Sequence, residues 1–331
     1  MHQSPSGMIA SALPRLTKYW QSATWAGLVG LLAVSTSYAQ EPDNPQALRD
    51  RALTLVNQSR SEHDLSPLSL GESLDATAQN HADDMFERNY YAHSSPEGDT
   101  VQDRFIAAGG SRWELVAENI ARCVQCTDAP DIAEVERLHE GWMNSPEHRA
   151  NILAEGLSRF GYGIVTDADQ GLYAVQTFAG PGTPRGYEAG QDLQRVETGD
   201  MAAILVDAVN MARDQSGLAP IEASDSLNAA AATLLPENVS NFSIDATGNV
   251  FDALDGAEQS EWSRLLTLAG ECGGCGTEPT RTDIEDFAQQ WLDQPSYSQS
   301  LLDPQIDAAG FILRADGAGR KIALLVVGTN R

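Results

Sequence analysis

The sequence is poor in basic residues and cysteine, and only one short hydrophobic segment interrupts it. Lysine and arginine total 21 of 331 residues against 47 aspartates and glutamates, a formal net charge of −26. A surface this negative repels nucleic-acid phosphates and anionic lipid headgroups, so we expect neither as a partner. Hydrophobic residues make up 42%, and the length is about twice that of a typical domain. The chain therefore has the material for two folded domains.

The hydrophobic segment lies near the N-terminus. Arg15 and Lys18 precede an apolar run over residues 25–34, and small residues follow up to Ala39. This order predicts a secretory signal peptide at residues 1–39. The run falls short of the ~20 apolar residues that span a bilayer, and the alternative is an uncleaved anchor. We expect a secreted or periplasmic protein with no stable membrane insertion after signal cleavage.

The four cysteines form two C-x-x-C pairs, Cys123 with Cys126 and Cys272 with Cys275. In an oxidising compartment a local disulfide within each pair is the first interpretation. A four-thiolate zinc site is the second, because two such pairs commonly build one. A thioredoxin-like redox role is the third, and neither pair follows a βαβ pattern.

The two cysteine pairs mark an internal repeat. They are 149 residues apart (272 − 123), and the same offset relates other tryptophans, prolines and glycines. Upstream the offset becomes 153, as between Val56 and Val209. A repeat this long indicates duplicated globular domains rather than a solenoid. We predict domains at residues 46–182 and 200–331, joined by a linker at 183–199. The pairs at offset 149 include Trp113 with Trp262, Trp142 with Trp291, and Gly161 with Gly310.

Hydrophobic periodicity predicts a mixed architecture for the first domain. Residues 47–62, 74–89 and 131–144 show helical spacing. Alternating apolar residues around 160–164 and 173–177, separated by a polar turn, predict a β-hairpin. Helices and antiparallel strands in this order are typical of an α+β layered fold.

All six histidines precede residue 149. We expect His63 and His139 at exposed helix positions, and His81 as a packed or surface side chain rather than a ligand. His93 and His148 lie among polar turn formers, which expose imidazoles. Neither an H-E-x-x-H zinc motif nor a G-x-S-x-G nucleophile elbow is present.

Four stretches of the first domain match one family. They are Asn80-His-Ala-Asp-Asp-Met85, His93-Ser-Ser-Pro-Glu-Gly98, Ala117-Glu-Asn-Ile-Ala121 and Gly141-Trp-Met-Asn-Ser-Pro-Glu-His-Arg-Ala-Asn-Ile-Leu153. Together they resemble bacterial CAP (SCP) domains, relatives of cysteine-rich secretory proteins, antigen 5 and plant pathogenesis-related proteins. The resemblance implies two tandem α-β-α sandwich domains, each of CAP type. It also implies a central cleft lined by two histidines and two acids.

Carried onto this sequence, the resemblance implies His93, Glu118 and His148 as residues of the cleft. The second acid falls on Ser145, so Glu147 or Glu140 would have to replace it. Two facing imidazoles can hold zinc, with Glu118 as a candidate to orient water or act as a base. The alternative is a hydrogen-bonded cluster without metal.

The second domain lacks these residues. The offset of 149 places Phe242, Thr267 and Tyr297 where the first domain has its two histidines and Glu118, so we expect a degenerate copy. The first function hypothesis is an exported binding protein for an unknown extracytoplasmic ligand, non-enzymatic or of undetermined activity, with zinc as the metal the cleft could take. The alternatives are a zinc-dependent hydrolase acting on a peptide, wall or ester substrate, and a carrier of apolar ligands such as lipids or sterols.

Overall fold

The computed structural model describes residues 44–331. The predicted signal peptide at residues 1–39 lies outside this range. Within residues 44–331, no helix is long and apolar enough to cross a membrane. The described residues form a mixed α+β fold with two four-stranded sheets. We call residues 45–180 the first half and residues 201–330 the second half.

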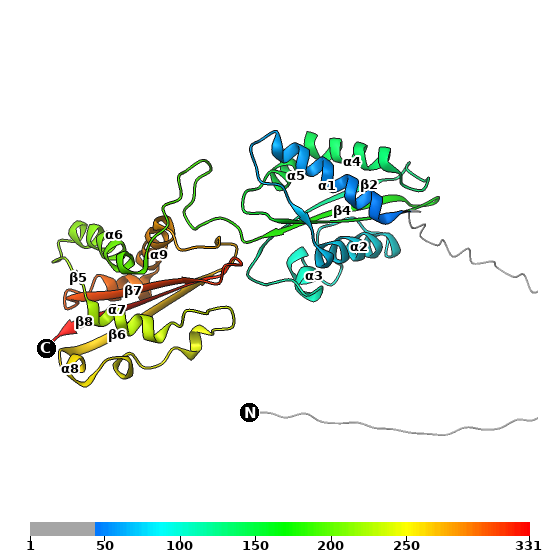
Figure 1. Cartoon of the computed structure of the whole chain (residues 1–331). Helices are drawn as coiled ribbons and strands as arrows, with labels where there is room; N and C mark the ends of the chain where they lie inside the picture. The colour runs from blue at the N-terminus through cyan, green and yellow to red at the C-terminus, as the bar shows by residue number, and fades with distance from the viewer. Residues whose placement is uncertain (1–43) are drawn as a thin grey trace, which may run out of the picture. The chain divides into compact units, whose positions relative to one another are not determined.

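The first sheet has the strand order β1-β3-β4-β2 (Figure 1). Its strands are β1 (Ser69–Leu70), β2 (Leu115–Cys123), β3 (Arg159–Asp167) and β4 (Gly171–Gly180). The predicted hairpin is confirmed as β3 and β4, which pair antiparallel from Arg159 to Asp167. Strand β2 pairs antiparallel with β4 and forms an edge of the sheet. This edge strand carries Glu118.

Helices cover both faces of the first sheet. Figure 1 shows α1 (Pro45–Ser61), α4 (Ile132–Asn144) and α5 (Pro146–Ile152) on one face. The other face carries α2 (Glu72–Glu87) and α3 (Val101–Ala107). The close approach of α2 explains Gly161, where a Cβ atom would overlap the backbone of Leu74. The three predicted helices are confirmed as α1, α2 and α4, with ends within two residues of the predicted ones.

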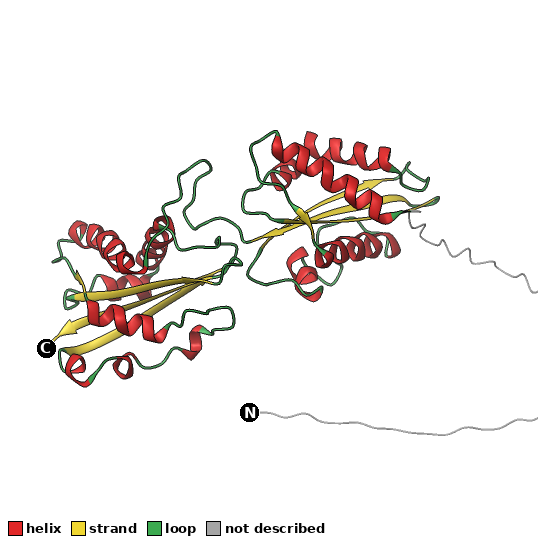
Figure 2. Ribbon diagram, in the orientation of Figure 1, coloured by secondary structure: helices red, strands yellow, loops and turns green. Residues whose placement is uncertain are grey.

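The second sheet has the matching order β5-β7-β8-β6 (Figure 2). In Figure 1, α6 and α9 lie on one face of this sheet, and α7 and α8 on the other. Gly310 again sits against a helix backbone, that of Leu227. The strands are β5 (Glu222–Ala223), β6 (Trp262–Cys272), β7 (Ala308–Ala315) and β8 (Lys321–Asn330). The helices are α6 (Met201–Gln215), α7 (Asp225–Leu234), α8 (Gly256–Gln259), α9 (Arg281–Asp293) and α10 (Pro295–Leu301), with 3-10 turns at Thr198–Asp200, Ile244–Ala246 and Val250–Ala253.

A buried arginine occupies the same place in both halves. Arg60 is 1% exposed and donates to the carbonyls of Ser66, Ile152 and Ala154. Arg213 is fully buried and donates to those of Ala219, Leu301 and Asp303. Each carbonyl of one set lies 149 or 153 residues from its counterpart in the other. The repeat read from the sequence therefore extends to individual hydrogen bonds.

Each C-x-x-C pair forms a local disulfide, Cys123–Cys126 and Cys272–Cys275. The first interpretation of the cysteines is confirmed. Because all four sulfur atoms are in disulfides, none is a thiolate that could bind zinc. The four-thiolate zinc site is therefore wrong.

Candidate functional site

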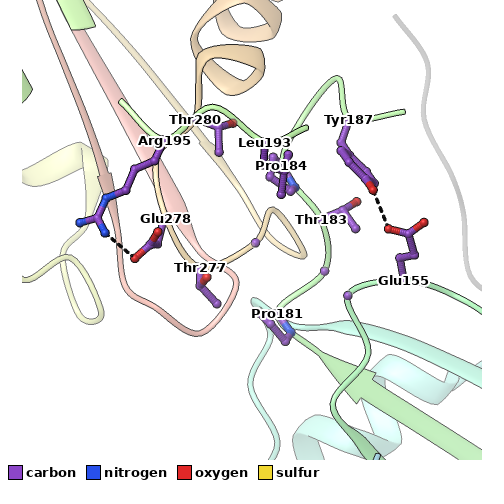
Figure 3. A pocket seen from close by; sticks show the side chains of 13 residues that line it. Glu155, Pro181, Thr183, Pro184, Tyr187, Leu193, Arg195, Thr277, Glu278 and Thr280 are labelled. Atoms are coloured by element: carbon purple, nitrogen blue, oxygen red, sulfur yellow. Dashed lines mark hydrogen bonds and ion pairs between the residues drawn. The ribbon is translucent and has the colours of Figure 1, made fainter. Parts of the chain in front are cut away.

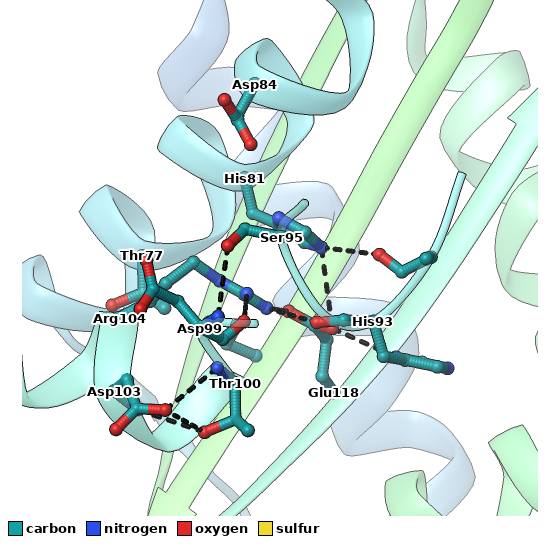
Figure 4. A network of polar contacts seen from close by, with 12 residues as sticks. Thr77, His81, Asp84, His93, Ser95, Asp99, Thr100, Asp103, Arg104 and Glu118 are labelled. Carbon is teal, nitrogen blue, oxygen red and sulfur yellow. Dashed lines mark hydrogen bonds and ion pairs between the residues drawn. The ribbon is translucent and has the colours of Figure 1, made fainter. Parts of the chain in front are cut away.

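Glu118 is the centre of a polar network in the first half (Figure 4). This residue is 5% exposed. Its Oε1 accepts a hydrogen bond from Nδ1 of His93 at 3.0 Å, and its Oε2 accepts one from Arg104 at 2.7 Å. Nε2 of His81 lies 3.8 Å from Oε1. We call these four residues the Glu118 network.

Strand β2, helix α3 and the loop that carries His93 bring together Glu118, Arg104 and His93. A capping box of Thr100 and Asp103 starts α3, which carries Arg104. The Arg104 guanidinium also donates to the carbonyls of His93 and Asp99, at 3.0 and 2.9 Å. One arginine thus fixes both the buried carboxylate and the loop that presents His93.

His81 comes from the helix on the same face. It is fully buried in α2, and its Nε2 donates to the carbonyl of Ala92 at 3.0 Å. The hydrogen bond to Ala92 therefore ties the loop before His93 to helix α2. This agrees with the prediction of a packed histidine, although its contact with Glu118 was not foreseen.

The three histidines differ in electrostatic environment. The hydrogen bond to Glu118 raises the pKa of His93, whose side chain is 59% exposed. Burial lowers the pKa of His81. Burial also lowers the pKa of His148, and the nearby His93 adds to that effect. Of these three imidazoles, His93 is therefore the one whose protonated form is favoured by its surroundings.

The other predicted site residues lie around α5. Ser145 is its N-cap, without a side-chain capping bond, and Glu147 is exposed in its first turn. Glu140 is exposed on α4. His148 is half-buried in α5, and its carbonyl accepts a hydrogen bond from Asn119 of β2 at 3.1 Å. Within the described residues, Ser145, Glu147 and Glu140 make no hydrogen bond or ion pair with the Glu118 network.

His139 corrects one prediction. We expected it to be exposed, but it is 8% exposed, and its Nε2 lies 2.9 Å from the Ser59 hydroxyl. The sequence does indicate burial of His139, because this residue is four residues after Val135 and three before Trp142. All three lie on the buried face of α4.

The donor set limits how a metal could bind. Within residues 44–331, no three or more histidines, cysteines, aspartates or glutamates are grouped so as to hold a metal ion. Both oxygens of Glu118 already accept hydrogen bonds. The side-chain atoms that remain as possible metal ligands are imidazole nitrogens, namely Nε2 of His93 and the ring nitrogens of His148. Metal-binding imidazoles commonly donate one ring N–H to a carboxylate, which orients the ring. His93 has this arrangement, with Nδ1 bonded to Glu118 and its side chain 59% exposed.

A cavity of about 330 Å³ lies elsewhere in the molecule (Figure 3). Tyr187 donates to Glu155 on one side of it, at 2.7 Å. Arg195 pairs with Glu278 on the other, at 3.0 Å. It shares no residue with the Glu118 network.

Comparison with known proteins identifies the class of the first half. Residues 53–178 match the model of the CAP family, the cysteine-rich secretory protein family. The chain therefore contains a CAP-family domain, as the sequence motifs predict, and this domain holds the whole Glu118 network.

Two relatives come from Bacillus subtilis (strain 168). The chain is 30% identical to the uncharacterized protein YkwD over 139 residues, which are 42% of this chain and 49% of that protein. It is 31% identical to the uncharacterized membrane protein YlbC over 112 residues, 34% of this chain and 30% of that protein. The chain thus spans half or less of the length of these relatives.

A solved structure with local likeness is an extracellular protein containing a SCP domain from Bacillus anthracis str. Ames. It is 30% identical, with a TM-score of 0.33, over 40% of each chain.

Proposed function

We propose that the protein is an exported binding protein whose ligand contacts His93 and His148 in the CAP-family domain. The observation that carries this proposal is the hydrogen bond from His93 Nδ1 to the buried carboxylate of Glu118. That bond fixes the ring and leaves Nε2 on the exposed side. The predicted signal peptide supports export.

The hydrogen bonds that Glu118 accepts favour a binding function over hydrolysis. A general base needs a carboxylate oxygen that can reach a proton on water or substrate. Here Arg104 and His93 each hold one oxygen, and the side chain is almost fully buried. Its role is therefore to orient His93, and Glu118 is not the free base that the hydrolase hypothesis assigns to it.

We choose zinc as the metal because imidazole nitrogens are common zinc ligands, here those of His93 and His148. A bound zinc would supply a Lewis-acidic centre with open positions for a further ligand. Arg104 opposes a second positive charge nearby, so we expect modest affinity. An exogenous carboxylate or phosphate would complete the coordination.

We further propose that the second half is a degenerate CAP-like domain with a structural role. Its sheet order and buried arginine support a common fold. The strand registers place Thr267 on β6 where Glu118 lies on β2. Tyr297 and Phe242, at the positions of the two histidines, pack against the hydrophobic core of that half. Side chains that fill a core cannot present a polar site.

Isothermal titration calorimetry with zinc chloride tests the proposal. We expect the purified protein to bind one zinc ion per chain, and a His93→Ala/His148→Ala variant to lose at least about tenfold in affinity. His63→Ala is the matched control, because His63 is an exposed histidine in a turn after α1. Unchanged binding in the double variant would contradict the site. The absence of any zinc binding by the unmodified protein would contradict the choice of metal.

A further inference from the structure

A row of polar side chains crosses the interior of the first half. Tyr162 on β3 is the cross-strand partner of Gln176 on β4, which is in turn the partner of Asn119 on β2. Directly paired residues point to the same face of a sheet. All three are at most 1% exposed. Tyr162 packs edge-on against Trp142 of α4, so the row faces the α1, α4 and α5 layer.

Three amides in this region form a continuous ladder. Asn119 Nδ2 donates to Oε1 of Gln176 and to the carbonyl of His148, both at 3.1 Å. Asn151 Nδ2 donates to Oδ1 of Asn119 at 2.9 Å and to the carbonyl of Glu118 at 3.0 Å. These bonds join helix α5 to strand β2 through the backbone carbonyls of His148 and Glu118.

The ladder connects the two faces of the edge strand. Glu118 and Asn119 are neighbours in β2, and their side chains point to opposite faces. Glu118 meets α2 and α3, whereas Asn119 meets α5. Fixing α5 to this strand therefore fixes where His148 stands relative to the Glu118 network.

The inner end of the ladder carries two buried polar atoms without a partner, Nε2 of Gln176 and Oη of Tyr162. The Gln176 amide is oriented by Asn119, which donates to its oxygen, so its NH₂ group must be the free end. A buried donor without an acceptor is costly. Buried water commonly satisfies such groups.

The second half lacks every member of this set. At the offset of 149, Asn119, Gln176 and Tyr162 become Leu268, Leu325 and Phe311, all buried in the core. Asn151 and His148 become Ser300 and Tyr297. A sheet of the same order thus forms in the second half with apolar residues in place of the ladder.

We propose that Gln176, Asn119 and Asn151 are positioning residues for His148, and that a buried water bound by Gln176 Nε2 and Tyr162 Oη closes the inner end of their ladder. The inference goes beyond the proposed ligand and does not depend on it.

A crystal structure of the metal-free protein tests the water site. We expect ordered solvent density within about 3.2 Å of both atoms. In a Gln176→Leu/Tyr162→Phe variant that density should be absent, because the site becomes as apolar as its counterpart in the second half. A direct bond between the two side chains, or a dry contact, would overturn the water site.

Histidine ring NMR of the metal-free protein tests the positioning role. We expect Asn119→Leu to shift or broaden the His148 ring signal, while that of His63 stays in place. The matched control is Asn57→Leu, since the Asn57 side chain also makes two hydrogen bonds, both with the backbone of Leu68 and neither with α5 or β2. If both variants melt earlier but neither moves the His148 signal, the ladder is only structural.

Two further variants keep this test decisive if Asn119→Leu does not fold. Asn151→Ser copies the residue of the second half on the exposed side of the ladder, and should also move the His148 signal. Gln176→Leu/Tyr162→Phe leaves the bond from Asn119 to the His148 carbonyl and should have a smaller effect. Because no zinc is added, failure of these shifts is separate from failure of the zinc titration.

Discussion

The two halves share a backbone plan but use their interiors differently. Both have the same strand order, a glycine against a helix backbone and a buried arginine that donates to carbonyls at three equivalent positions. The apolar core of the first half is divided into three separate clusters. That of the second half is one continuous cluster. Glu118, Asn119 and Gln176 of the first half are replaced by Thr267, Leu268 and Leu325 at the offset of 149, and such differences mark the polar residues that we interpret as functional.

The second half has one buried ionic contact of its own, and breaking it should have the largest effect. Lys321 and Asp283 form an ion pair in which both side chains are fully buried. Burial lowers the pKa of Lys321. We expect Lys321→Met to lower the free energy of unfolding by about 3–5 kcal/mol, because the Asp283 charge stays buried without its partner. Hydrogen exchange measured by peptide should place the loss in the second half.

The matched change in the first half should be mild. At the offset of 149, Glu134 takes the place of Asp283, and its partner is Arg137, whose side chain is 66% exposed. Arg137→Met should change stability by less than about 1 kcal/mol, as for exposed ion pairs. Equal losses in the two variants would remove this distinction between the halves.

Much of the fold could be predicted from the sequence. Residues 47–62, 74–89 and 131–144 have helical periodicity because each helix buries one face. The hairpin at 159–180 was visible because a polar turn separates two apolar runs. The edge strand β2 and helix α3 were not predicted. Strand β2 carries Glu118, Asn119 and Arg122, so its pattern is too polar to stand out.

The site was only partly predictable, for a related reason. His93 and Glu118 belong to motifs that resemble a family. Arg104 lies in no such motif and reaches Glu118 only through the tertiary fold. The ladder pairs Asn119 with Gln176 across 57 residues, and no local period encodes that contact. Long-range polar contacts have no signature in the spacing of residues along a single chain.

The buried His139 should give the first half an acid sensitivity that the second lacks. Burial, with a contribution from Arg51, lowers the pKa of His139 to about 4 from 6.5. Its counterpart at the offset of 149 is Ala288. The unfolded chain binds the proton near pH 6.5 and the folded chain only near 4, so stability present above pH 6.5 is lost as the pH falls through this window. The loss approaches about 3 kcal/mol at pH 4.

Urea denaturation from pH 7.5 to pH 4 measures this effect. The decline of the unfolding free energy should be shallower in His139→Gln, because that side chain does not titrate here. Parallel curves for the two proteins would show that His139 is not the source. Other carboxylates titrate near pH 4 in both proteins, so the difference between the curves is the informative quantity.

The smallest expected difference between the halves concerns one register position in the two sheets. Glu118→Gln removes the negative charge that Arg104 and His93 share, and should cost about 2 kcal/mol because Arg104 is largely buried. Thr267→Val, at the same place in the second sheet, should cost less than about 0.5 kcal/mol because Thr267 is exposed. The same Glu118→Gln variant should lower the pKa of His93 in an NMR titration, since the bond to Glu118 is the largest cause of its rise. A His93 pKa that does not move would mean that Glu118 does not set the state of this ring, and the two sheets would then differ at this position only in polarity.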